Sequence, residues 1–139
     1  SFSAWAAYET STTWALVDFG SSKTLQITGI TATEGNLLYL ESTPSDWLQE
    51  DTTSYAMQIG FHIDTTGHSV RNIYSNNTLP NYIPLSLSMI FTVPASFTSK
   101  TISVYAMRET GSSGTNTLAQ RGTLQDEKWC HLSIFEIQQ

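Results

Sequence analysis

The side chains in this sequence that could bind a metal ion lie close together in one predicted hairpin. His62 and Asp64 are two residues apart, so they lie on the same side of the strand predicted for residues 54–64. His68 follows a short turn at 65–67 and begins the next strand, so the three side chains could approach one another. Two imidazoles and a carboxylate would suit zinc or another transition metal. The alternative is that all three are ordinary polar groups on the outer face of the hairpin, and no cofactor is implied elsewhere.

The spacing of the other reactive side chains does not indicate catalysis. No serine lies in a Gly-x-Ser-x-Gly turn, and Ser, His and Asp do not occur in an arrangement that favours a triad. Asp46, Glu50 and Asp51 form the only carboxylate cluster that could serve a glycosidase, but acids in a polar loop are usually just solvated. Cys130 is the only cysteine and lies in an apolar run, which is typical of a buried small hydrophobe. We predict that the protein is not an enzyme.

Aromatic residues beside hydrogen-bonding side chains are better candidates for a binding site. Sugar recognition needs an exposed ring for stacking and polar groups that bond to hydroxyls. Two predicted surface loops, residues 42–51 and 75–84, supply this combination. The candidate ligand-binding residues are Asp46, Trp47, Gln49, Arg71, Tyr74, Asn77, Asn81 and Tyr82, of which Arg71 could contact an acidic sugar. The alternative for each aromatic ring is that it folds back and caps the sandwich.

The elements that must position these loops are predicted to be strands. Between residues 85 and 93, apolar side chains occur at every second position, which is the period of a strand with one buried face. After a break at 94–96 the alternation resumes, with Ile102, Val104 and Ala106 on one face. Two long strands and a short link predict a hairpin within residues 84–108.

Most of the rest of the chain also alternates between apolar and polar residues. Alternation and turn residues predict about nine strands, at 14–19, 23–33, 37–40, 54–64, 68–74, 85–93, 101–108, 118–124 and 129–137. A charged fraction of only 13 %, together with abundant Ser, Thr and aromatic residues, favours strands and polar loops over helices. We therefore predict an all-β antiparallel sandwich or jelly roll, with residues 1–13 as a lead-in strand or arm and 14–139 as one head domain.

Charge and hydropathy exclude two classes of partner. The net charge is −6 and the six basic residues are scattered, so there is no basic stripe for a nucleic acid. No apolar run approaches the roughly 18 residues of a membrane span, so membrane insertion is not expected. Because the sequence opens with neither Met nor a signal-like segment, we expect a domain excised or processed from a larger chain.

Two predicted strands have more apolar faces than one core requires. Tyr105 and Met107 lie opposite the apolar face of their strand, and Leu132 and Ile134 lie opposite the face that carries Phe135. An extra apolar face implies an interface, so these four residues are predicted to lie between subunits. The alternative is that loops of the same chain cover both strands.

Four short stretches resemble a known family: residues 25–30 (LQITGI), 35–40 (GNLLYL), 91–94 (FTVP) and 104–108 (VYAMR). Together with the last strand, they resemble the C1q/TNF-like jelly-roll heads. Within that group the chain is most similar to receptor-binding domains at the tips of bacteriophage tail fibres and spikes. The resemblance implies a homotrimer whose inner sheets face the threefold axis, at the surface of a virion or in the extracellular space.

The expected function is recognition without chemistry. Loops of a trimeric head would bind a host-surface glycan or protein, and three weak sites would act together through avidity. One alternative is a structural cap that trimerises a fibre and has no ligand of its own. Another is an extracellular C1q/TNF-like module that binds a protein partner.

Overall fold

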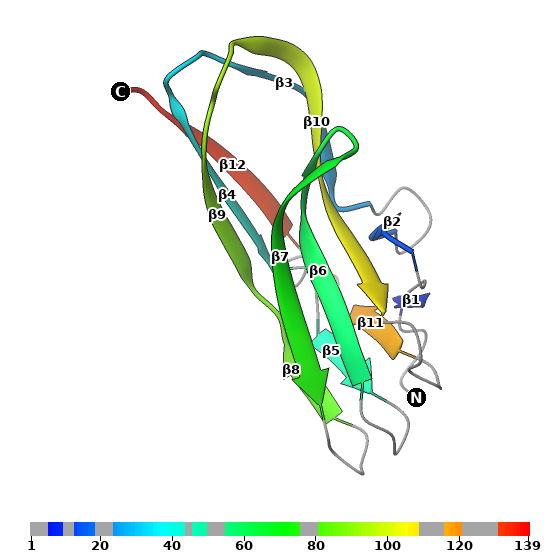
Figure 1. Ribbon diagram of the computed structural model, residues 1–139. Helices are drawn as coiled ribbons and strands as arrows, with labels where there is room; N and C mark the ends of the chain where they lie inside the picture. The colour runs from blue at the N-terminus through cyan, green and yellow to red at the C-terminus, as the bar shows by residue number, and fades with distance from the viewer. Residues whose placement is uncertain are drawn as a thin grey trace.

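The computed structural model describes residues 6–9, 13–18, 24–43, 46–49, 55–75, 81–108, 116–120 and 131–139 (Figure 1). Every regular element in these ranges is a strand: β1 Ala6–Glu9, β2 Ala15–Leu16, β3 Gln26–Ala32, β4 Leu37–Thr43, β5 Asp46–Gln49, β6 Tyr55–Ile63, β7 Thr66–Ser75, β8 Asn81–Pro84, β9 Leu87–Thr92, β10 Phe97–Arg108, β11 Asn116–Gln120 and β12 His131–Ile137. Within the same ranges no helix has the length and hydrophobicity of a membrane span.

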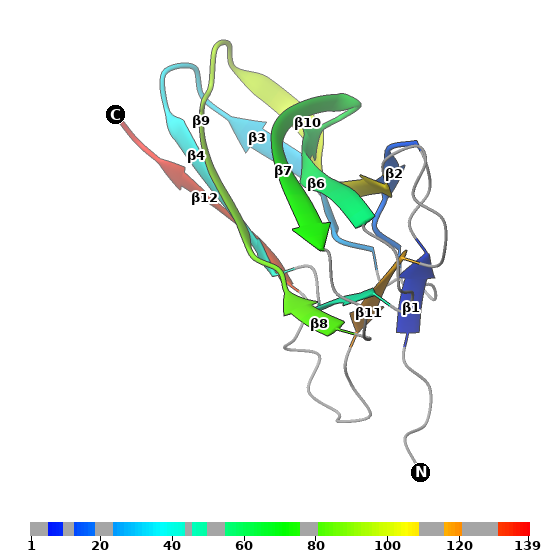
Figure 2. The same cartoon turned by 60° about the horizontal axis from the view of Figure 1, so that its bottom comes forward.

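The strands form two antiparallel sheets in a sandwich-like arrangement. The first sheet has the order β2-β10-β6-β7, and β3 pairs with β10 beyond β2 along the same edge. The second consists of the groups β1-β11-β5-β8 and β12-β4-β9. We count the two groups as one sheet because β5 follows β4 and β9 follows β8 along the chain, and β4 pairs with β9 as β5 pairs with β8. β1 closes this sheet beside β11 (Figure 2).

The hydrophobic core lies between the two sheets. Alternate residues of β6 and β10 supply one side of it, and Leu38 and Leu40 of β4 supply part of the other. The buried faces predicted for residues 85–93 and 101–108 are confirmed, because Leu85, Leu87 and Val93 are buried, as are the alternate residues of β10. The period of two therefore indicated correctly which side chains face the core.

The hairpin predicted within residues 84–108 does not form. β9 pairs with β4 in the second sheet, whereas β10 pairs with β3 and β6 in the first. Residues 93–96 carry the chain from one sheet to the other (Figure 1). Two backbone bonds tie this crossover to the β3–β4 turn: Val93 N donates to Asn36 O, and Gly35 N donates to Val93 O, both at 2.9 Å. Alternation identifies a buried face but not a partner strand, and here the two buried faces lie in opposite sheets.

The two stretches predicted as surface loops also contain strands. Residues 46–49 form β5, which lies between β11 and β8 in the middle of its group, and residues 81–84 form β8. Pro84 is the last residue of β8, a place where a proline need not donate a ladder hydrogen bond. Pairing with neighbouring strands overrides the local preference of Asp, Ser and Pro for turns.

Candidate functional site

The outer face of β12, β4 and β9 carries a contiguous group of apolar side chains. The register places Phe135 opposite Tyr39 and Tyr39 opposite Ile90, so these three form a row across the strands. Ile137 and Leu37 are opposite each other in the adjacent row. Ile90 is 64 % exposed, Phe135 56 % and Ile137 46 %. We call these five residues the apolar face.

The apolar face is the outward side of strands whose inward side already fills the core. Leu38 and Leu40 of β4 are 1 % and 0 % exposed, and they alternate with Leu37 and Tyr39. Single exposed apolar side chains are normal on a protein surface, but a contiguous group of large ones marks a site of interaction. The expectation that the last strand is apolar on both faces is therefore met, and the described chain covers only one of these faces.

The subunit-interface residues predicted from the sequence occupy other places. Leu132 and Ile134 are half-buried and pack against the core, whereas Phe135 points outward. Tyr105 and Met107 are half-buried on the outer face of β10, in the first sheet. Leu132 and Ile134 thus lie on the inward face of β12, and the subunit contacts predicted for the four residues stay predictions. Both faces are apolar in sequence, and only the pairing of β12 with β4 determines which of them meets the core.

Polar contacts at the two ends of β12 hold the apolar face in register. Glu136 Oε1 accepts hydrogen bonds from Asn36 Nδ2 at 2.8 Å and from Thr33 N at 3.0 Å. These two bonds, that of Asn36 first, lower the pKa of the Glu136 carboxyl. At the other end, His131 Nε2 lies 4.0 Å from Glu41 Oε1. The last strand is therefore fastened to the β3–β4 turn and to β4, which makes the apolar face a defined surface.

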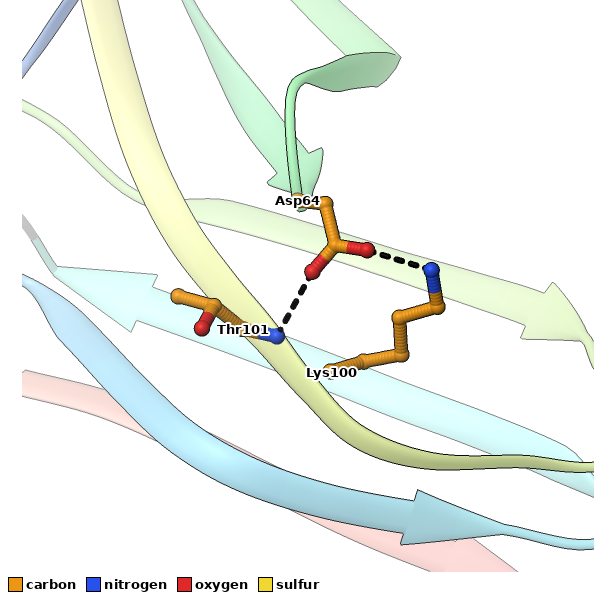
Figure 3. A network of polar contacts seen from close by, with 3 residues as sticks. All are labelled: Asp64, Lys100 and Thr101. Carbon is orange, nitrogen blue, oxygen red and sulfur yellow. Dashed lines mark hydrogen bonds and ion pairs between the residues drawn. The ribbon is translucent and has the colours of Figure 1, made fainter.

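The metal site predicted from His62, Asp64 and His68 does not form. Asp64 Oδ1 accepts a hydrogen bond from Thr101 N at 3.0 Å, and Asp64 Oδ2 pairs with Lys100 (Figure 3). Both carboxylate oxygens of Asp64 therefore already have hydrogen-bond partners. Among the described side chains, no three His, Cys, Asp or Glu residues lie close enough together to hold a metal ion.

The two histidines of that prediction lie in different surroundings. His62 stacks on Tyr105 in the first sheet, with 4.1 Å between ring centroids. His68 meets Phe91 of the second sheet edge-on, with 4.9 Å between centroids. A register shift between β6 and β7 falls at this point, because Phe61 is opposite Ser69 but His62 is opposite Gly67. The extra residue breaks the alternation that would have placed the two imidazoles on one face.

Asp64 instead fastens the β6–β7 turn to β10. Its backbone N donates to Thr101 O at 2.7 Å while its side chain accepts from Thr101 N, so the two residues are bonded in both directions. Asp64 has a φ of 53°, a left-handed conformation that Asp tolerates better than most residues. The hydrogen bond from Lys100, followed by that from Thr101, lowers the pKa of the Asp64 carboxyl.

We expect Asp64→Asn to reduce the acid sensitivity of the fold. A carboxyl whose pKa is lower in the folded state than in the unfolded state stabilises the fold above its unfolded pKa, near 3.8. That contribution is lost as the pH falls through the lowered folded-state value. Urea unfolding midpoints measured from pH 6 to pH 2.5 should therefore fall less steeply in Asp64→Asn than in the wild type. Glu34→Gln, at an exposed acid of the β3–β4 turn, is the control. Equal slopes in wild type and Asp64→Asn would show that the Asp64 carboxylate does not stabilise the fold through Lys100 and Thr101.

The residues predicted to bind a ligand are distributed over three strands. Asp46, Trp47 and Gln49 lie in β5, Asn81 and Tyr82 in β8, and Arg71 and Tyr74 in β7, while Asn77 lies outside the described residues. Gln49 is directly opposite Asn81, and Trp47 is opposite Ile83. β5, β8 and the end of β7 lie at the same end of the sandwich (Figure 1). The proposed ligand contacts remain predictions.

The apolar face can contribute binding energy by removing hydrocarbon from water. Full burial of a side chain such as Ile or Phe is worth roughly 1.5–3 kcal/mol, and the face carries several. The only polar atom among its five side chains is the hydroxyl of Tyr39, so its chemistry is association rather than catalysis. No protein-family model, curated protein or solved structure matched the chain in comparisons with known proteins.

Proposed function

We propose that this chain is the homotrimeric jelly-roll head of a phage tail fibre or spike, which binds a host-surface glycan or protein without chemistry. The observation that carries the proposal is the apolar face, with Ile90, Tyr39 and Phe135 aligned across three strands. A second copy of the same chain is the proposed occupant. The number three comes from the resemblance to C1q/TNF-like heads, whose inner sheets face a threefold axis.

The order of the strands supports the jelly roll. If β2 and β3 are taken as one strand, and likewise β4 and β5, β8 and β9, and β11 and β12, eight strands remain in the described chain. The first of these pairs with the last, the second with the seventh, the third with the sixth and the fourth with the fifth. This nested pairing of a long folded hairpin is typical of jelly rolls.

The receptor would bind at the end of the sandwich where β5, β8 and the end of β7 meet. This end carries Trp47, Gln49 and Asn81, which the register places on one face of the sheet, and Tyr82, which is opposite Leu48 on the other face. Aromatic rings and amides of this kind suit stacking and hydrogen bonding with sugars. A trimer presents the set three times. Linked sites of this kind can bind about 10²–10⁴ times more tightly than a single one.

A structural cap is the second candidate function, and one observation favours it. The apolar face consists of exposed or half-buried side chains at defined register positions, and Glu136 fastens the last strand that forms part of it. These contacts bear on assembly and require no ligand. An extracellular C1q/TNF-like module that binds a protein is the third candidate.

Light scattering of the purified chain is the first test. We expect a mass about three times the 15.4 kDa of one chain, because burial of the apolar face stabilises the trimer. A monomer at micromolar concentration would overturn the proposal.

Adsorption to host cells or to a glycan array then separates the candidate functions. Trp47→Ala and Tyr82→Ala should abolish binding while the trimer remains intact. Unchanged adsorption by both trimeric variants would favour the structural cap, and binding that survives removal of glycans from the target would indicate a protein receptor.

A further inference from the structure

His62 is a buried imidazole on the outer side of the first sheet. It lies between Phe61 and Ile63, which face the core, so its own side chain points the other way. It is nevertheless only 7 % exposed. The ring of Tyr105 stacks on it with an interplanar angle of 9°, and Trp14 lies 5.4 Å away between ring centroids.

The imidazole of His62 packs against the backbone of Gly67. The two residues are opposite each other in β6 and β7, and a Cβ atom on Gly67 would lie 3.2 Å from His62 Nε2. Such a contact is closer than ordinary packing allows, so the ring fits against the bare backbone of the glycine. Tyr105, Trp14 and the backbone of β7 therefore enclose His62 on three sides.

The enclosure suits a neutral imidazole and not a charged one. His62 has one hydrogen bond with the backbone of Thr65, and its Nδ1 is buried with no hydrogen-bond partner among the described residues. A neutral imidazole carries one N–H, whereas an imidazolium carries two. Protonation of His62 would leave a charged group with a buried N–H that has no acceptor, which is costly.

Burial and one neighbouring side chain act in the same direction. Burial, and after it the electrostatic effect of His68 on β7, lowers the pKa of His62, and the Thr65 hydrogen bond only partly opposes them. The other titratable groups on the packed elements are Tyr105, Asp18 in the segment that carries Trp14, and Asp64 on the turn, whose carboxylate is held by Thr101 and Lys100.

We propose that His62 is a pH-sensitive contact, and that acid releases Trp14 from the outer face of the first sheet and opens the tip of the β6–β7 hairpin, which is part of that sheet. In the open state, in which Trp14 and the hairpin tip have moved away, the imidazole of His62 is exposed to water and can accept a proton. In the closed state, which the structure shows, His62 cannot accept a proton without losing its packing against Tyr105 and Gly67. This pH-sensitive contact does not involve the apolar face, which lies on the other sheet.

The direction and size of the effect follow from linkage. Above about pH 6.5, the ordinary pKa of histidine, both states are neutral and the closed state keeps its full stability. As the pH falls below this value, only the open state binds the proton, so the opening equilibrium rises up to tenfold per pH unit until the closed state also titrates. At pH 5.0 the increase reaches up to about 30-fold.

Amide hydrogen exchange of the full chain, followed by mass spectrometry at pH 7.5 and pH 5.0, tests the proposal. Each peptide is corrected for the exchange rate of the unfolded chain at the same pH. We expect the protection of peptides covering residues 13–18 and 57–68 to fall by up to about 30-fold at pH 5.0, while peptides covering 37–43 change little. His62→Phe keeps an aromatic ring but cannot titrate, so its protection should not depend on pH in this way. His131→Gln, on the opposite sheet, is the matched control and should behave like the wild type.

An NMR titration of the wild-type histidines decides the proposal even where His62→Phe fails to fold. A His62 resonance that titrates below pH 6.5 supports it. A value at or above 6.5 would overturn it, and so would an equal loss of protection in folded His62→Phe.

Discussion

Ile90→Asp is expected to convert the proposed trimer into monomers, so that the mass from light scattering falls from about three chain masses to one. In the separate subunit Ile90 is 64 % exposed, so an aspartate there would be hydrated and the fold would change little in stability. In the assembled head the same carboxylate would lie against apolar side chains of a neighbouring subunit. An unpaired buried charge costs roughly 3–5 kcal/mol, and each trimer would contain three.

A substitution of the same kind elsewhere separates a loss of assembly from a loss of folding. Thr28→Asp adds the same charge at an exposed position of β3 in the first sheet, and it should leave the trimer intact. Thermal unfolding of both variants, followed by circular dichroism, should show cooperative transitions. A trimeric Ile90→Asp protein would show that the apolar face does not lie between subunits.

Much of the fold could be predicted from sequence because alternation is a local property. Residues 57–63, 85–93 and 102–106 bury the faces that their pattern indicated. Strand partners depend instead on contacts between distant parts of the chain, such as the hydrogen bond between Asn36 and Glu136, 100 residues apart. No local pattern encodes such a contact, which is why β9 and β10 were predicted as a hairpin although they lie in opposite sheets.

The candidate site could be predicted only in part, because its location also depends on strand pairing. The two apolar faces of residues 129–137 predicted that one of them would not be needed for the core, and Phe135 and Ile137 are indeed exposed. The sequence could not predict which face would meet the core, because Leu132, Ile134, Phe135 and Ile137 are similar in hydrophobicity. The pairing of β12 with β4 decides it. Residues 46–49 were misread for a related reason, since their Asp and the preceding Pro-Ser are typical of loops until neighbouring strands pair with them.

Phe61→Ala is expected to lower the free energy of unfolding by about 3–5 kcal/mol. Phe61 is the largest of the fully buried side chains that the structure describes, and its core cluster includes Leu38 and Leu40 of the opposite sheet. Truncation removes the buried ring and leaves a cavity that the two sheets can fill only in part. For a domain of ordinary stability, about 5–15 kcal/mol, this loss is a large share of the total.

Phe135→Ala is the matched comparison because it removes the same atoms from a side chain that is 56 % exposed. Both substitutions are best made in the Ile90→Asp background, since subunit association would otherwise contribute to apparent stability. Urea unfolding should then show a loss of about 1 kcal/mol or less for Phe135→Ala, mainly from its contact with Tyr39 at 6.4 Å between ring centroids. If Phe61→Ala does not fold, Phe61→Leu should show a smaller loss in the same direction. Equal losses at the two positions would mean that β6 does not pack against the second sheet, and the inward and outward faces on which the apolar face depends would have to be reassigned.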